Sequence, residues 1–126
     1  MALFDTDILI DHLLNKQGAT ETILKFKTEK NFCSVITFGE ILFGMRENEK
    51  DKTFKFLDSL KTIDVTKQII LLAHDVKTGA KGFDLELYDC IIAATAITED
   101  LILVTKNVRH YPDKRIKIFI PEYLSQ

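Results

Sequence analysis

Hydrophobic residues along the chain form short runs separated by amphipathic stretches, and this alternation predicts strands connected by helices. Strands are expected in the short runs, at residues 2–4, 32–36, 62–65, 101–104 and 116–120. Between them hydrophobic residues recur three and four positions apart, which predicts helices at residues 6–14, 19–30, 37–46, 50–60, 66–78 and 89–98. Gly18 is interpreted as a break between the first two helices, and residues 79–88 are expected to form a loop.

The order of these elements indicates the fold class. Parallel strands need a long crossover connection, usually a helix, so strands that alternate with helices favour a mostly parallel sheet with helices on both faces. The 126 residues suffice for one hydrophobic core but not for two. No repeat, low-complexity stretch or linker divides them, and residues 1–126 are expected to form a single α/β domain with one functional site.

The charge balance excludes one way of binding nucleic acid. Lys and Arg number 17 against 19 acidic residues, for a net charge of −2. The chain therefore lacks the excess of positive charge by which histone-like proteins and basic arms hold nucleic acid. A nuclease remains compatible with this balance, because a metal ion can bridge an acidic pocket to a phosphate.

The rest of the composition predicts an intracellular protein. Cys33 and Cys90 lack the spacing of a zinc site or a disulfide framework, and they are expected to be small core residues in a reducing cytosol. The first residues show no basic segment with a cleavage site, and no hydrophobic run reaches about 18 residues. We therefore expect a soluble cytoplasmic protein that does not associate with a membrane.

Three carboxylates occupy similar positions in the pattern. Asp5, Glu40 and Asp89 each stand where a hydrophobic run gives way to the start of a predicted helix. In an open α/β sheet the strand ends and the following helix starts line one crevice, so these side chains are expected to converge. Converging carboxylates repel one another, and a hard cation such as Mg²⁺ or Mn²⁺ is the usual reason for such a cluster. A metal held there can activate water for attack on a phosphodiester.

Helix capping is the structural alternative for the same three residues. Asp is among the preferred N-cap residues, so Asp5 and Asp89 fit that role. Thr37 and Glu40 match the capping-box spacing, in which the glutamate reaches back to the threonine amide. Asp7 and Asp11, on the first predicted helix, are interpreted as solvated residues or as residues behind the metal ligands.

The segment after the strand at 101–104 adds polar candidates. The Thr105 hydroxyl would point into the same crevice and orient a water or a carboxylate, or else form a simple turn or cap. Lys106 and Arg109 are candidate contacts for RNA phosphates, together with Lys77 and Lys81 ahead of the Asp89 helix.

Four segments in order carry a family resemblance: LFDTDILID, TFGEILFG, DCIIAATA and LVTKNVRHY. They resemble the successive signature segments of PIN-domain endoribonucleases, especially the VapC-type toxins of prokaryotic toxin–antitoxin pairs. The likeness spans Leu3 to Tyr111. It implies a PIN-like three-layer α/β/α fold with a small, mostly parallel sheet of four or five strands. It also implies a magnesium-dependent hydrolase that cleaves RNA, the toxin of a type II toxin–antitoxin system.

The resemblance also implies roles for individual residues. Asp5 and Asp89 would be the principal metal ligands, and Glu40 a further ligand or a group that positions water. Many family members have Asp where this chain has His110, and Asn107 nearby brings hydrogen bonds without charge. This difference leaves open whether one or two metals bind. His110 is expected either to position a substrate phosphate or shuttle a proton, or to be an exposed loop residue beside Tyr111.

Association with other proteins is implied in the same way. VapC-like toxins form homodimers and are inhibited by a cognate VapB-like antitoxin whose tail covers the active cleft. Gly39 and Gly44 thin the helix that carries Glu40, and Phe43 lies on its flank. Phe43 fits a dimer seam or an antitoxin groove, and ordinary core packing explains it equally well.

Two other functions compete with RNA cleavage. Asp5 and Asp7 form a D-x-D pair after the first strand, which also marks haloacid-dehalogenase-like phosphatases with the first aspartate as nucleophile. A PIN-like module that binds RNA or protein with weak or no catalysis is the other alternative, suggested by the missing fourth acid.

Overall fold

The computed structural model describes residues 1–26 and 31–123, and its helices and strands alternate as the sequence predicts. In chain order the elements are β1 (Ala2–Phe4), α1 (Thr6–Leu13), α2 (Gln17–Leu24), β2 (Asn31–Ser34), α3 (Val35–Gly44), the 3-10 turn η2 (Glu47–Glu49), α4 (Lys50–Asp58), β3 (Lys61–Ile63), α5 (Lys67–Gly79), α6 (Leu87–Thr98), β4 (Ile102–Val104), the 3-10 turn η3 (Val108–His110) and β5 (Lys117–Phe119).

The sheet has five strands in the order β3-β2-β1-β4-β5, and every neighbouring pair is parallel. The predicted sheet is therefore confirmed, at the upper of the two expected strand numbers. The central strand β1 is fully buried and pairs through Leu3 with Phe32 on one side and Leu103 on the other. The chain builds β2 and β3 outward from one edge of β1, then returns to place β4 on the other edge. Such a reversal of strand order is where α/β sheets open a crevice at their carboxyl ends.

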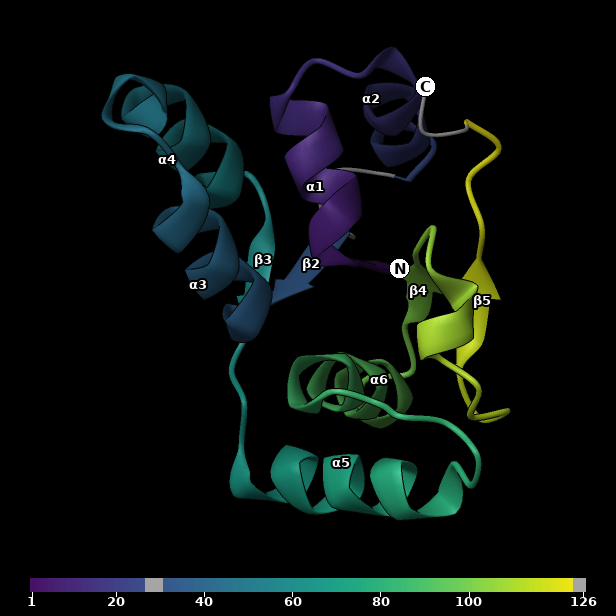
Figure 1. Cartoon of the computed structure of the whole chain (residues 1–126). Helices are drawn as coiled ribbons and strands as arrows, with labels where there is room; N and C mark the ends of the chain where they lie inside the picture. The colour runs from purple at the N-terminus through teal and green to yellow at the C-terminus, as the bar shows by residue number, and fades with distance from the viewer. Residues whose placement is uncertain (27–30, 124–126) are drawn as a thin grey trace.

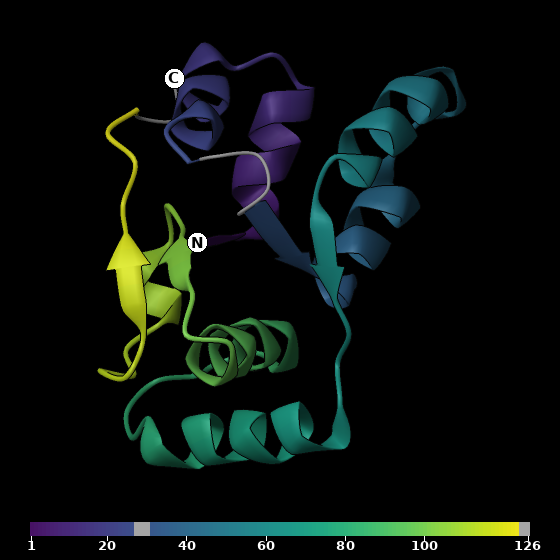
Figure 2. The same ribbon diagram turned by 180° about the vertical axis from the view of Figure 1, so that it is seen from behind.

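Helices cover both faces of the sheet, as expected. Helices α5 and α6 lie together on one face, while α1 and α2 lie on the other with α3 and α4 beside them (Figures 1 and 2). Ala93, Ala94 and Ala96 of α6 are buried against the first face, where small side chains let the helix approach the strands closely. The second face has its own core, which includes Phe4 and Leu57.

Gly18 does not break a helix, contrary to the prediction. The second helix begins at Gln17, includes Gly18, and ends at Leu24, so it is shorter than the expected 19–30. Residues 27–30 of that prediction lie outside the described residues. The glycine is needed for close approach, because a Cβ atom added there would lie 2.1 Å from Cβ of Tyr123.

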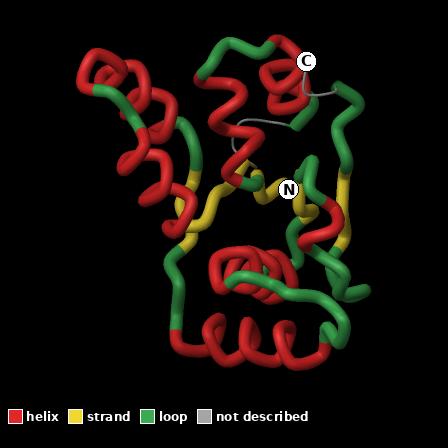
Figure 3. The backbone as a smooth tube through the Cα atoms, in the orientation of Figure 1, coloured by secondary structure: helices red, strands yellow, loops and turns green. Residues whose placement is uncertain are grey.

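Figure 3 shows how the helices, strands and loops follow one another, and two further helix starts differ from the prediction. Helix α3 begins at Val35 rather than 37, because the Ser34 hydroxyl accepts a hydrogen bond from the Ile36 amide at 3.1 Å and ends the strand early. The predicted capping box of Thr37 and Glu40 is therefore wrong. Helix α6 begins at Leu87, which places Asp89 inside its first turn rather than at its N-cap.

Both cysteines behave as predicted, since Cys33 and Cys90 are free and buried. Burial raises the pKa of the Cys33 thiol to about 11 and keeps that side chain protonated. Within the described ranges, 1–26 and 31–123, the helices are too short or too polar to cross a membrane.

Candidate active site

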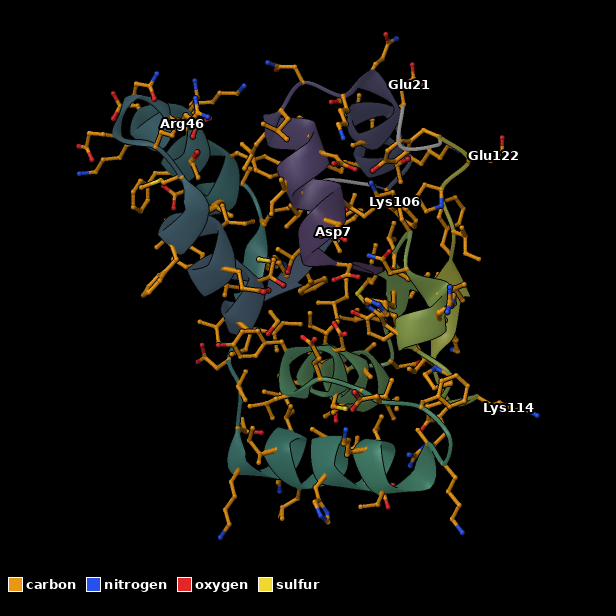
Figure 4. All side chains as sticks on the ribbon, in the orientation of Figure 1. Asp7, Glu21, Arg46, Lys106, Lys114 and Glu122 are labelled. Carbon is orange, nitrogen blue, oxygen red and sulfur yellow. The ribbon has the colours of Figure 1, made fainter. Side chains whose placement is uncertain are left out.

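A cleft of about 380 Å³ opens where the carboxyl ends of β1 and β4 meet α3 and α6. Its lining contains six carboxylates, and we call it the acidic cleft: Asp5, Asp7, Glu40, Asp84, Glu86 and Asp89. Asn107 and His110 complete the polar part of the wall. Figure 4 labels Asp7 at the end of α1 that lies in the middle of the molecule. The three acids selected from the sequence thus line one cleft, as expected, although Glu40 lies in the interior of α3 and not at a helix start.

Asp5 has the capping role that the sequence left open, and it also lines the acidic cleft. It is the N-cap of α1, and its Oδ1 accepts a hydrogen bond from the Thr6 amide at 2.8 Å. Its Oδ2 accepts a second hydrogen bond from Thr105 Oγ1 at 2.8 Å. The side chain is 6% exposed. Burial raises the pKa of the Asp5 carboxyl above its ordinary value, and the charge of Asp7 adds to the rise against the effect of the Thr105 hydrogen bond.

Asp89 faces Asp5 from the first turn of α6. Its Oδ2 lies 3.2 Å from Nδ1 of His110, and its Oδ1 accepts a hydrogen bond of 3.4 Å from the Tyr111 hydroxyl. Burial raises the pKa of this carboxyl, and the negative charges of Asp5 and Glu86 add to the rise, while His110 opposes it. The charge of Asp5 thus destabilises the ionised form of Asp89.

Glu40 is held by a chain of hydroxyl groups rather than by a backbone amide. Thr6 Oγ1 donates to Glu40 Oε1 at 2.8 Å and lies 2.9 Å from Thr37 Oγ1. Because the Thr6 hydrogen points to Glu40, Thr37 must be the donor to Thr6. This chain crosses from α3 to α1 and back, and it fixes one glutamate oxygen beside the N-cap of α1.

The segment after β4 supplies hydrogen bonds rather than charge. Thr105 is fully buried, and its hydroxyl both donates to Asp5 and accepts from the Asn107 amide at 2.9 Å. The orienting role and the turn role predicted for Thr105 therefore coexist. The Asn107 side chain donates to Asp7 Oδ2. His110 is exposed, contacts Asp89, and has its ring 6.4 Å from that of Tyr111, as expected of a loop residue beside Tyr111, while its role toward the substrate stays a prediction.

The basic side chains near the acidic cleft differ in whether they pair with an acidic residue. Lys106 pairs with Asp11, which also accepts a hydrogen bond of 2.8 Å from the Tyr123 hydroxyl and lies 3.3 Å from Lys16 Nζ. Asp11 is buried, so its interpretation as a solvated residue is wrong. Its partners Lys106 and Tyr123 lie more than ninety positions away in sequence. Arg109 is exposed and, among the residues that the structure describes, forms no salt bridge.

Three residues of the site were missed by sequence reasoning. Asp84 and Glu86 line the acidic cleft from the segment that was interpreted only as a loop. Lys77 holds that segment in place, because its Nζ donates to the Leu85 carbonyl and lies 3.6 Å from Asp84. The buried Tyr111 binds Asp89, and burial and the nearby carboxylates raise the pKa of its phenol. The only sign of Asp84 and Glu86 in the sequence is their spacing, five and three positions before Asp89.

The donor set fits a hydrated hard cation better than a closed protein cage. Among the described residues no three carboxylate, histidine or cysteine side chains come together as a ready metal-binding group. Magnesium, however, is commonly held by one or two carboxylates and retains several waters. Asp5 and Asp89 both line the acidic cleft and would supply such a pair of carboxylates.

Comparison with known proteins gives consistent similarities in sequence. A family model described as "PIN domain" matches residues 2–113. Ribonuclease VapC19 from Mycobacterium tuberculosis is 34% identical over 118 residues, which cover 89% of this chain and 93% of that protein. Ribonuclease VapC10 from the same organism is 32% identical over 115 residues, which cover 89% of this chain and 86% of that protein.

Solved structures are similar over nearly the whole chain. A toxin–antitoxin complex from Klebsiella pneumoniae contains a chain that aligns with a TM-score of 0.86 and 27% identity. The alignment covers 98% of this chain and 100% of that one. A chain in the VapBC2 complex from Rickettsia felis, bound to a promoter DNA fragment, aligns with a TM-score of 0.84 and 21% identity over 96% of this chain and 98% of that one. The second likeness supports the fold alone.

Proposed function

The chain belongs to the PIN domain family, and on that premise we propose that it is an endoribonuclease that cleaves RNA phosphodiester bonds as the toxin of a type II toxin–antitoxin pair. The observation that carries the proposal is the convergence of Asp5, Glu40 and Asp89 in one acidic cleft at the strand ends. The curated relatives that match the chain over most of their length are named ribonucleases.

A magnesium ion, or manganese in its place, is proposed to bind between Asp5 and Asp89, with Glu40 as the adjoining group. Such an ion lowers the pKa of a bound water and stabilises negative charge on the leaving oxygen. The raised pKa values of both aspartates support the assignment, because a cation would relieve the charge that burial makes unfavourable.

The protein's own groups prepare the site for this chemistry. Thr105 and the Thr6 amide fix the two oxygens of Asp5, so its carboxylate has one orientation. The hydroxyl of Thr6 fixes one oxygen of Glu40 and leaves the other to orient an attacking water or accept its proton. Tyr111 contacts one oxygen of Asp89 and His110 contacts the other.

Substrate binding is assigned to the positive side chains beside the acidic cleft. Arg109 is proposed to contact an RNA phosphate and His110 to lie near the scissile bond. Lys106 remains a proposed RNA contact, although its amino group also pairs with Asp11. An RNA-cleaving toxin would act in the cytoplasm, where its substrate is made, and residues 1–126 would act as one PIN-like domain.

Association is proposed through the flank of α3, with a second copy and with a VapB-like antitoxin. Phe43 is 96% exposed, so the core-packing interpretation of this residue is wrong. A Cβ atom added at Gly39 or Gly44 would meet nothing within 4 Å, which leaves this side of the helix free for another chain. The similar Klebsiella pneumoniae chain comes from a toxin–antitoxin complex.

The phosphatase alternative finds less support in the comparisons. The geometry of Asp5 alone does not separate the two chemistries, but the family model that matches residues 2–113 is the PIN domain and the matching curated relatives are named ribonucleases. Phosphatase chemistry would also leave a covalent aspartyl-phosphate on Asp5, which mass measurement after trapping would detect.

The test is cleavage of a mixed RNA pool by the purified protein, with and without EDTA, followed by mapping of the new ends. We expect magnesium-dependent cuts with 5′-phosphate and 3′-hydroxyl ends. Asp5→Asn, Glu40→Gln and Asp89→Asn should stay folded but lose cleavage, while the exposed Asp58→Asn should not. If all three variants cut at the wild-type rate, the carboxylates are structural. Binding of RNA without any cleavage would favour the binding-module alternative.

A further inference from the structure

A second hollow of about 660 Å³ adjoins the acidic cleft, and we call it the side hollow. It lies between the segment from Gly82 to Leu85 and the segment from Lys106 to His110. Asp84, Leu85, Asn107 and His110 line both spaces, so the side hollow continues directly from the acidic cleft. A chain whose phosphate sits in the acidic cleft would therefore pass into the side hollow.

The chemistry of the side hollow differs from that of the acidic cleft. Its wall includes the ring of Phe83, which is 50% exposed, and the exposed Val108. Its carboxylate is Asp84, and its cations are Lys106, which pairs with Asp11, and Arg109, which pairs with no acid of the described residues. The side hollow thus offers an aromatic surface and a positive charge, where the acidic cleft offers carboxylates.

Both walls of the side hollow are already ordered by hydrogen bonds. On one side, the Phe83 amide donates to the Ala80 carbonyl at 3.1 Å, and Lys77 holds the Leu85 carbonyl. On the other side, the His110 amide donates to the Asn107 carbonyl at 2.9 Å. A preformed concave site of this size can take a small organic group with little cost of reorganisation.

We propose that the side hollow binds an unpaired nucleotide next to the scissile phosphate, with its base stacked on Phe83 and its phosphate in contact with Arg109. The inference rests on the proposed ribonuclease function and assigns Phe83 and Arg109 to one nucleotide subsite beside the acidic cleft. Every base presents a flat face that stacks on an aromatic ring, but in a double helix those faces are covered. The side hollow therefore takes an unpaired base and tolerates several bases at this position.

Binding measured without cleavage tests the inference. A fluorescein-labelled single-stranded RNA of about eight nucleotides, and the same strand annealed into a duplex, are titrated with full-length protein in EDTA, with anisotropy as the readout. Phe83→Ala and Phe83→Leu should weaken binding of the single strand about tenfold or more, whereas Phe83→Tyr should bind as wild type. The wild type should bind the duplex more weakly than the single strand.

Arg109→Gln tests the phosphate contact separately. Loss of one phosphate contact should reduce the slope of log affinity against log salt concentration by about 0.7 for a single strand. Two matched variants serve as controls and should change neither quantity. Leu71→Ala removes a side chain on α5 that is 61% exposed, and Arg46→Gln removes a charge at the far end of α3, away from Asp7 and Lys106 (Figure 4).

The outcomes separate this inference from the proposed function. If the wild type cleaves RNA but Phe83→Ala binds the single strand like the wild type, the side hollow is not a nucleotide site and the ribonuclease proposal stands. If binding depends on Phe83 but the wild type cleaves no RNA, the side hollow stands and the proposed function fails. Equal binding of single strand and duplex overturns the stacking arrangement.

Discussion

Asp5 caps α1 and Asp11 lies in the second turn of that helix; both are 6% exposed, but their carboxyl groups have opposite electrostatic surroundings. Hydroxyl and amide groups donate hydrogen bonds to Asp5, and burial raises its pKa. Asp11 is buried too, but Lys106, Tyr123 and Lys16 outweigh that effect and lower its pKa. Low exposure therefore does not by itself decide the direction of the pKa shift, whereas the presence of a cationic partner does.

The largest expected effect is on catalysis. Asp5→Asn should reduce RNA cleavage at least about a hundredfold, because a catalytic metal contributes several kcal/mol to the transition state and each 1.36 kcal/mol is tenfold in rate. Asp11→Asn should stay within about tenfold of the wild type, since Asp11 does not line the acidic cleft and its charge is used in pairs with Lys106 and Lys16. Initial cleavage rates in magnesium measure both. Equal losses in the two variants would remove the distinction between the sites.

The second effect is on stability, and here Asp11→Asn should have the larger effect and Asp5→Asn the smaller. Asp11→Asn should lower the free energy of unfolding by about 2–3 kcal/mol, because it leaves a partly buried lysine without its counter-charge. Asp5→Asn should leave that free energy unchanged or raise it in EDTA, since the amide avoids the burial of a charge. Urea unfolding in EDTA compares the variants, and destabilisation by Asp5→Asn would contradict the raised pKa of the Asp5 carboxyl.

The third effect is stabilisation by metal. At a magnesium concentration ten times the dissociation constant, the wild type should gain about 1.4 kcal/mol in the free energy of unfolding. Asp11→Asn should show the same gain, whereas Asp5→Asn and Asp89→Asn should show little of it. The measurement is urea unfolding with and without magnesium. A gain that persists in both cleft variants would place the ion elsewhere.

The fourth effect isolates one hydrogen bond of the structural carboxylate. Tyr123→Phe removes the donor to Asp11 Oδ2 and should lower the free energy of unfolding by about 1 kcal/mol. RNA cleavage should be unchanged at saturating magnesium, because Tyr123 does not line the acidic cleft. A large loss of activity with no loss of stability would mean that the Asp11 cluster takes part in catalysis.

The smallest expected effect is a difference in pH dependence. Asp11 has a lowered pKa, so its contribution to stability is present above the ordinary value of 3.8 and is lost as the pH falls through the folded-state pKa. Asp5 has a raised pKa, so stability falls as the pH rises from 3.8 through its folded-state pKa. In EDTA, Asp11→Asn should reduce the loss of stability as the pH falls below 3.8. Asp5→Asn should reduce the loss of stability as the pH rises above 3.8.

The comparison also explains which parts of the fold were predictable. The alternation of hydrophobic runs and amphipathic stretches is a local signal, and it predicted the parallel sheet and most helices. Ser34 ends β2 early because its hydroxyl caps a helix, although Val35 and Ile36 favour a strand. Gly18 owes its role to Tyr123. Sequence periodicity carries no information on such distant contacts.

The candidate site also contains residues that were predictable from the sequence and residues that were not. Asp5, Glu40 and Asp89 were predictable as a group because strand ends meet in one crevice of a parallel sheet. Asp84 and Glu86 were missed because their segment has no helical or strand period, and their placement depends on Lys77. Asp11 was misread because the pattern shows that a residue lies on a helix but not which lysine it will meet.

The hydrogen bond from Thr105 to Asp5 joins residues 100 positions apart, and Tyr111 reaches Asp89 from the same late part of the chain. Likewise, both edges of the central strand β1 are paired only after β4 has joined the sheet. During synthesis on the ribosome, the acidic cleft therefore lacks one wall until residues 105–111 have emerged. A nascent chain that is shorter than this has no assembled cleft, and any partner that recognises the finished cleft can bind only after that segment has left the ribosome.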